Sequence, residues 1–115
     1  MKQEQQVANL ELSRKLKSLG VKQESAFYYD VAGKVHLITD GRKSYHLTAA
    51  FTVAELGEML PKNYSSIRPL EADTWHCYRY HPSQIQGSTE AITEADARAK
   101  MLIYLIEKGI VKVAR

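Results

Sequence analysis

The chain of 115 residues has a single cysteine, Cys77, and no long apolar run. One thiol cannot form an intrachain disulfide, which fits a reducing compartment. The longest apolar segment, residues 101–106, is far shorter than the roughly 18 to 20 residues that span a bilayer. Residues 1–6 are polar and lack the apolar centre of a signal peptide. We therefore expect a cytoplasmic protein that has no membrane partner.

A dense basic stripe is also missing, although the net charge is +3 and the isoelectric point is near 9. Residues 1–22 carry five basic and two acidic groups, and residues 93–115 carry five and three. Dedicated nucleic-acid-binding proteins concentrate their lysines and arginines more strongly on one surface. The charge distribution alone therefore does not predict a nucleic-acid-binding protein.

The sequence contains no glycine-rich phosphate loop, nucleophile elbow or metalloprotease motif. His76 and Cys77 are neighbours on an expected strand, so their side chains point to opposite faces and cannot converge on one metal ion. Cys77 is expected to lie on the buried face beside Trp75 and to behave as a small apolar residue. We therefore predict no catalytic residue, metal site or cofactor, and a small enzyme remains a third hypothesis.

Hydrophobic residues make up 44% of the chain and charged residues 25%, as in folded globular proteins. The length suits one domain over residues 1–115, with residues 1–6 disordered. The order of helical and strand patterns predicts an α+β fold. We expect one antiparallel sheet of four or five strands, with an N-terminal helix, a short middle helix and a long C-terminal helix packed on it.

Three helices are indicated by apolar spacing and by end signals. The first runs from about Asn9 to Gly20, where glycine favours a left-handed helix end that lets Val21 pack back on the helix. The middle helix has a Thr52–Glu55 capping box and ends at Pro61, while Gly57 inside it indicates a close packing contact. The apolar positions of these two helices are Leu12, Leu16, Leu19, Val53, Leu56 and Leu60.

The last helix has the strongest signals. Thr93 caps its start and Gly109 follows its last turn. Its expected apolar face consists of Ala95, Ala99, Leu102, Ile103 and Ile106. Two ion pairs at four-residue spacing, Glu94 with Arg98 and Asp96 with Lys100, are expected on its solvent side.

Period-two alternation predicts the strands. Residues 25–39 read as a hairpin that turns at Gly33 and has Phe27, Tyr29 and Val31 on one face. Residues 43–47 are expected to form a third strand, residues 74–80 a fourth and residues 84–90 a weak edge strand. Residues 62–73 read as a loop, and residues 110–113 as a short terminal strand.

Two segments, residues 50–61 (AFTVAELGEMLP) and 93–106 (TEADARAKMLIYLI), together with residues 10–25, resemble small uncharacterised proteins of bacteriophages and prophages. The order of elements also resembles the phage ABA sandwich. The resemblance covers most of the chain and implies a phage or prophage origin. It implies no activity, and it supplies no functional residues, because the shared positions are those that cap helices and fill the core.

The candidate binding surface combines tyrosines with cations. Exposed aromatic rings beside basic groups suit either a protein interface or stacking on bases. The alternative is that a helix covers the same strand face and makes it part of the core. The candidate residues are Tyr28, His76, Tyr78, Arg79 and Tyr80 on strands and Arg14, Lys15 and Lys17 on the first helix.

We favour a phage or prophage accessory protein that binds a host or phage protein. A nucleic-acid or nucleotide-binding protein that uses these tyrosines and basic residues is the second hypothesis. Open sheet edges and the apolar tail of residues 110–113 would also allow a homodimer.

Overall fold

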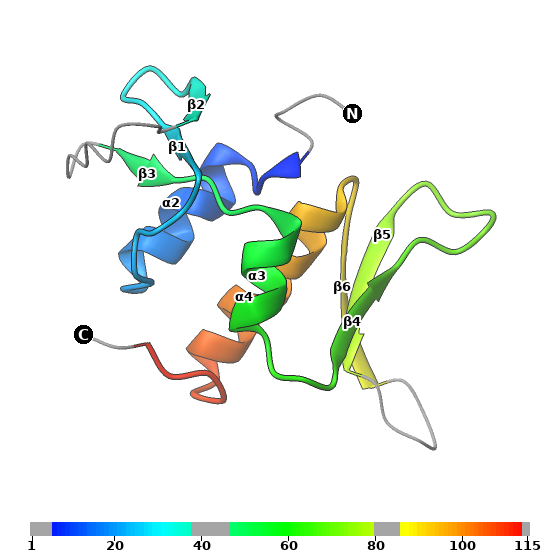
Figure 1. Cartoon of the computed structure of the whole chain (residues 1–115). Coiled ribbons are helices and arrows are strands. Elements are labelled where there is room, and N and C mark those ends of the chain that lie inside the picture. Colours follow the sequence, from blue (N-terminus) through cyan, green and yellow to red (C-terminus); the bar gives the residue numbers. More distant parts are fainter. Residues whose placement is uncertain (1–5, 38–46, 80–85, 114–115) are drawn as a thin grey trace.

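The computed structural model describes residues 6–37, 47–79 and 86–113. They form three helices, α2 (Leu10–Ser18), α3 (Val53–Met59) and α4 (Glu94–Glu107), so the predicted α+β class is confirmed (Figure 1). One antiparallel sheet has the order β2-β1-β3 and contains β1 (Phe27–Tyr29), β2 (Val35–Leu37) and β3 (Thr48–Ala49). The other has the order β4-β5-β6 and contains β4 (Tyr64–Ile67), β5 (Trp75–Arg79) and β6 (Gln86–Ala91).

The expectation of one sheet of four or five strands is therefore wrong. The strands divide at α3, because β3 pairs back with β1 before the chain enters that helix. After α3 the chain starts the second sheet with β4, on the far side of α4 (Figure 1). Sequence periodicity reports that a segment is a strand, but it does not report which partner the strand takes.

Helix α4 is the centre of the molecule. The β4–β6 sheet packs on one side of it, and α2 and α3 pack on the other (Figure 1). The predicted apolar face is buried at Ala95, Ala99, Leu102 and Ile103, and Ile106 is partly buried. A second buried row, Ala97, Met101 and Leu105, was not expected. Two faces are buried because the helix is covered from both sides, and the small alanines let the sheet approach closely.

Both ends of α2 form as predicted. The Asn9 side-chain oxygen accepts a hydrogen bond from the Leu12 N–H at 2.8 Å and caps the helix. Gly20 has a φ of 94°, and the Val21 N–H donates to the Leu16 carbonyl at 3.1 Å. This is the Schellman ending that the glycine indicates. Leu16 and Val21 both lie in the main core.

The capping box of α3 is confirmed. The Thr52 hydroxyl accepts from the Glu55 N–H at 3.2 Å, and the Glu55 carboxylate accepts from the Thr52 N–H at 2.9 Å. A Cβ atom at Gly57 would lie only 2.3 Å from Nη1 of Arg98. The close contact expected at this glycine is therefore confirmed, and it is made by a side chain of α4.

Two strand predictions are confirmed, and one face assignment is wrong. Strands β1 and β2 form the expected hairpin, and β5 pairs with the edge strand β6. Val31 is not on the buried face with Tyr29, since its side chain is 76% exposed. Strand β1 ends at Tyr29, and the turn that follows carries Val31 out to solvent.

Four further expectations concern connecting and terminal segments. Residues 62–73 are not one loop, because they contain strand β4; its tyrosine and isoleucine favour a strand. Residues 110–113 form no strand, and Val111 and Val113 instead pack against the core. The expected strand at residues 43–47 falls almost wholly outside the described residues, as does the expected disorder of residues 1–6.

Candidate binding face

The β4–β6 sheet has one face against α4 and a second face that no described helix or strand covers (Figure 1). We call this second face the outer face. Two rows of side chains run across it, as the strand register gives them. The first row is Ile67, His76 and Glu90, and the second is Ser65, Tyr78 and Ser88.

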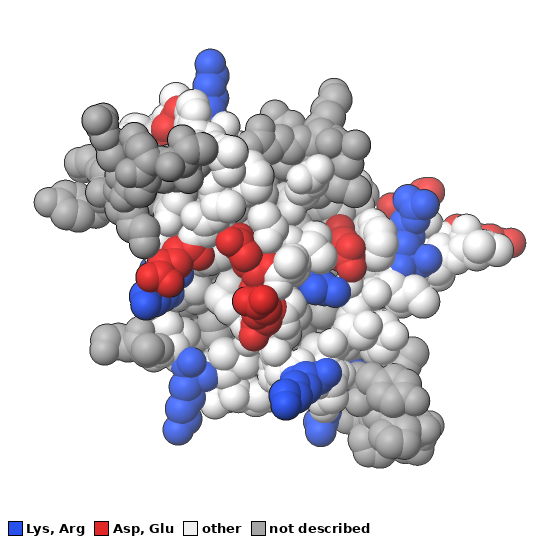
Figure 2. Space-filling model, viewed as in Figure 1, with Lys and Arg blue, Asp and Glu red and all other residues white. Residues whose placement is uncertain are grey.

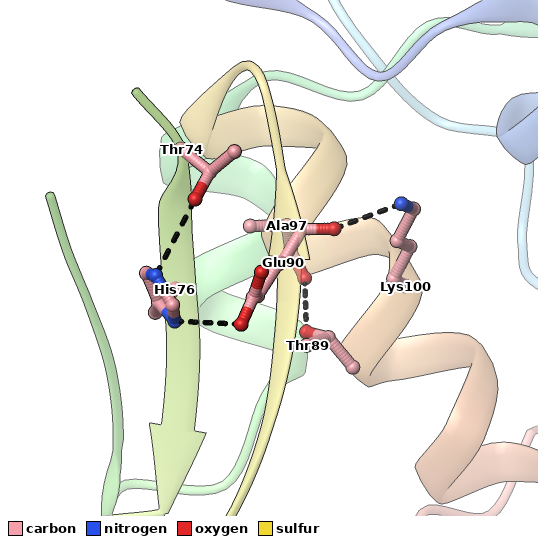
Figure 3. Close-up of polar contacts among 6 residues, drawn as sticks. All are labelled: Thr74, His76, Thr89, Glu90, Ala97 and Lys100. Carbon is pink, nitrogen blue, oxygen red and sulfur yellow. Dashed lines mark hydrogen bonds and ion pairs between the residues drawn. The ribbon is translucent and has the colours of Figure 1, made fainter. Parts of the chain in front are cut away.

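His76 lies at the middle of the first row. Its Nδ1 atom is 3.5 Å from a carboxylate oxygen of Glu90, and its Nε2 atom is 3.4 Å from the Thr74 hydroxyl (Figure 3). The imidazole is half-buried, and the Glu90 side chain is largely exposed. The ring is therefore held on the sheet surface between two polar neighbours.

Two side-chain hydrogen bonds connect strand β6 to α4. The Lys100 ammonium donates to the Glu90 carbonyl at 2.8 Å, and the Thr89 hydroxyl donates to the Ala97 carbonyl at 2.7 Å (Figure 3). Both bonds use side chains to satisfy backbone carbonyls at the sheet edge and in the helix. The outer face is therefore presented by strands that have a fixed position on α4.

The inner face of β5 is part of the core. Cys77 is fully buried and Trp75 packs partly buried beside it, so the predicted face assignment is confirmed. Burial raises the pKa of the Cys77 thiol to about 11, while the nearby Arg98 guanidinium opposes the rise and the Glu94 carboxylate adds to it. A thiol in this state is a small apolar side chain and a poor nucleophile near neutral pH.

A polar cluster that the sequence did not indicate joins α4 to α3 and β4. The Arg98 guanidinium donates to the Ser66 hydroxyl at 2.9 Å and to the Val53 carbonyl at 3.0 Å, and it lies 3.4 Å from Glu94. The Ser66 hydroxyl also donates to Glu94. The arginine therefore bridges three elements, and the bare backbone of Gly57 gives it room.

The expected solvent-side ion pairs of α4 need correction. Glu94 and Arg98 do pair, but their side chains are only 26% and 20% exposed, because α3 and β4 enclose them. The pairing of Asp96 with Lys100 is wrong. Asp96 instead accepts from the Asn9 N–H at 2.7 Å and thereby fixes the start of α2, which leaves Lys100 to bond β6.

The predicted aromatic surface is only partly assembled. Tyr78 and His76 share the outer face, and Tyr80 lies outside the described residues. The placement of Tyr28 on the same surface is wrong: Tyr28 belongs to the other sheet and is 3% exposed. Its hydroxyl donates to the Gln23 carbonyl at 2.9 Å, so even its polar end is used within the fold. Arg79, at the end of β5, is exposed.

The predicted cations of α2 lie apart from the outer face, because α4 separates α2 from the β4–β6 sheet. Arg14 is exposed, Lys15 lies 3.7 Å from Glu107, and the Lys17 ammonium donates to the Leu47 carbonyl at 2.8 Å. In the view of Figure 2, acidic side chains gather near α3 and basic ones are scattered around them. The structure therefore does not bring the predicted tyrosines and cations onto one surface.

Two clefts, of about 450 and 400 Å³, are lined by no histidine or cysteine of the described residues. Within residues 6–37, 47–79 and 86–113, no three His, Cys, Asp or Glu side chains are grouped so that they could hold a metal ion. No helix in this part of the chain is long and apolar enough to cross a membrane.

Comparison with known proteins adds no relative. The chain matches no protein-family model, no curated protein and no solved structure.

Sequence reasoning missed several residues of these surfaces. Ile67 and Ser65 fall in the segment predicted to be a loop, but they lie on strand β4, for which the β-favouring residue types of Tyr64 and Ile67 are the signal in the sequence. Glu90 was predicted to lie on an edge strand, but nothing in its local sequence indicates His76 as a neighbour. That contact depends on the register between β5 and β6.

Proposed function

We propose that this protein is a phage or prophage accessory protein of the bacterial cytoplasm that binds a protein partner through the outer face. The partner would be a product of the phage or of its host. The origin is suggested by the resemblance of residues 50–61 and 93–106 to phage and prophage proteins. The binding role is suggested by one observation: a sheet face that no described element covers carries Tyr78, His76 and an isoleucine, Ile67, that is 49% exposed.

The composition of this face supports a protein partner. Aromatic residues are enriched at protein interfaces, and polar neighbours such as Ser65 and Ser88 provide hydrogen bonds around them. An antiparallel sheet that meets only water usually places polar residues on its outer side. Half-buried Tyr78 and exposed Ile67 depart from that pattern, and a partner surface would remove their apolar atoms from water.

The same face argues against nucleic acid as its partner. Nucleic-acid binding depends on cations that replace the counterions of phosphate groups. The two rows of the outer face contain a carboxylate, Glu90, and no lysine or arginine. The cations of α2 lie beyond α4 and would not contact a ligand held on the sheet.

Site-specific photocrosslinking in host cells tests this proposal. A crosslinking amino acid at exposed Ser65 should capture one defined protein, whereas the same group at Arg14 on α2 should not. The Tyr78→Ala substitution should abolish capture from position 65, and Arg14→Ala should leave it unchanged. Equal capture from both positions, or capture that survives Tyr78→Ala, would contradict the proposal. Capture of a second copy of this chain would instead indicate a homodimer.

A further inference from the structure

A cleft of about 400 Å³ lies where the β4–β6 sheet meets α4. It is formed between the end of the β4–β6 sheet and the C-terminal half of α4, and six of its lining residues matter here: Tyr64, Arg79, Thr89, Met101, Tyr104 and Leu105. The register of β5 and β6 shifts between Tyr78 and Arg79, at the edge of this cleft. Such irregularities change the direction of the side chains beside them and often occur next to binding sites.

The walls and floor of the cleft have different chemistry. Met101 and Leu105 are 4% and 1% exposed and belong to the core, so they form an apolar floor. Tyr64 comes from β4 and Tyr104 from α4, and the Tyr104 side chain remains 49% exposed. A concave site with an apolar floor, aromatic walls and a few polar groups is typical of small-molecule binding.

The charge of the cleft has one sign. Arg79 is a cation, and no described acidic residue lines the cleft. The Arg79 guanidinium forms no hydrogen bond or ion pair with residues 6–37, 47–79 or 86–113. The ammonium of Lys108 lies 5.8 Å from the centroid of the Tyr104 ring and places a second positive charge next to the cleft. An unpaired guanidinium is suited to a carboxylate or phosphate group.

We infer that this cleft binds a small molecule that combines a planar ring with an anionic group. The ring packs on the floor of Met101 and Leu105 between the two tyrosines, and the anion pairs with Arg79. A volume of about 400 Å³ lies within the range of ligand sites. This inference goes beyond the proposed function, because Ser88 is the one residue of the two outer-face rows that also lines the cleft.

Methyl NMR of the full chain, labelled at methionine, provides the test. Met101 is the floor of the cleft, whereas Met59 lines a different cleft near the C-terminus of α4 and serves as the internal control. We expect saturable shifts of the Met101 methyl signal and no comparable shift of Met59. The probes are adenosine monophosphate, 4-hydroxybenzoate, adenosine and inorganic phosphate. Binding of the first or the second distinguishes a phosphate-bearing from a carboxylate-bearing ligand.

Two exposed substitutions complete the test. Removing a charge-assisted hydrogen bond should weaken binding about tenfold or more in Arg79→Gln, while Arg14→Gln on α2 should change it less than about twofold. Loss of a stacking wall in Tyr104→Ala should also weaken binding about tenfold. The inference is overturned if no probe gives saturable Met101 shifts up to about 10 mM, a limit that corresponds to negligible affinity. It is also overturned if adenosine binds as well as its monophosphate, or if Arg79→Gln binds as the unsubstituted protein does.

Discussion

The two sheets of this protein treat their tyrosines differently. In the β2-β1-β3 sheet, Tyr28 and Tyr29 are adjacent on one strand and both are buried, at 3% and 5% exposure. Tyr28 joins the main core, and Tyr29 packs in a smaller cluster against Val7. In the β4–β6 sheet, only the inner face packs on α4, and Tyr78 remains on the outer face. Both tyrosines of β1 are therefore buried, whereas in the second sheet Tyr64 packs partly buried against the core and Tyr78 lies on the outer face.

The difference follows from what packs on each sheet. Strand β1 of the first sheet has core residues on both faces. Tyr28 and Tyr29 point to opposite faces, but both faces are covered, so both tyrosines are buried. The second sheet packs on α4, and no helix or strand of the described residues covers its other face. Function in this molecule is therefore to be sought on the second sheet.

The largest expected effect on stability comes from replacing a buried tyrosine of the first sheet, compared with replacing the outer-face tyrosine of the second sheet. Tyr28→Ala should lower the free energy of unfolding by about 3–5 kcal/mol, because it leaves a cavity in the main core. Tyr78→Ala, the matched variant on the outer face, should cost less than about 1 kcal/mol. Urea denaturation followed by circular dichroism measures both. Equal losses in the two variants would remove the distinction between the sheets.

The protein should lose stability in alkaline solution because Cys77 is buried on the inner face of the second sheet. The pKa of Cys77 is raised from 9.0 to about 11 by burial, so the unfolded chain loses this proton first. The stability that the protonated thiol provides is complete below pH 9 and is lost as the pH rises toward 11. The loss should be on the order of 2 kcal/mol.

The comparison with Cys77→Ala separates the effect of the thiol from that of other groups that change charge in alkaline solution. The difference in unfolding free energy between the two proteins should shrink as the pH rises from 9 to 11. A constant difference would mean that Cys77 is not sealed between the sheet and α4.

The cluster that joins the second sheet to α3 can be broken at Gly57. Alanine favours a helix by about 1 kcal/mol over glycine, and this substitution would ordinarily stabilise α3. Here the added methyl group would displace the Arg98 guanidinium, so we expect Gly57→Ala to destabilise by about 1–3 kcal/mol. Glu58→Ala, at the next and exposed position, is the control. In the background of Arg98→Ala, Gly57→Ala should no longer destabilise.

The smallest expected effect on stability comes from Asp30, in the exposed turn of the first sheet. The pKa of Asp30 is lowered from 3.8, first by the Lys34 N–H that donates to its carboxylate and next by His36, whose Nε2 atom lies 2.7 Å away. The resulting stability is present above pH 3.8 and is lost as the pH falls through the lower folded value. Acid unfolding of Asp30→Asn, compared with the unsubstituted protein, should lack this contribution. An Asp30 midpoint at or above 3.8 by NMR would exclude the interaction.

Local sequence signals predicted local structure well. The start of α2 near Asn9, the Gly20 ending and the Thr52–Glu55 box each depend on residues within five positions, and all three form. Long-range structure was less predictable. The burial of Tyr28 depends on which strands share a sheet, and the second buried row of α4 depends on a sheet that covers it. Neither is encoded by the spacing of nearby residues.

The residues of the candidate sites also fall into two groups, those that local spacing predicts and those that only long-range packing brings together. His76 and Tyr78 were found because alternation places both on one face of a strand. Tyr64 and Tyr104 were missed, since they are far apart in sequence and meet only across the cleft between β4 and α4. The Arg98 cluster was also missed, because a four-residue spacing alone cannot distinguish an exposed ion pair from an enclosed one.

Hydroxyl-radical footprinting, read by mass spectrometry, tests the central contrast most directly. In the native chain, the account predicts that Tyr78 is oxidised readily while Tyr28 and Tyr29 stay protected until the protein unfolds. Addition of the partner protein that photocrosslinking identifies should then reduce the oxidation of Tyr78 and leave the oxidation of Tyr28 and Tyr29 unchanged. Protection of Tyr78 in the free chain equal to that of Tyr28 would contradict the account, because the outer face would then not be an open surface.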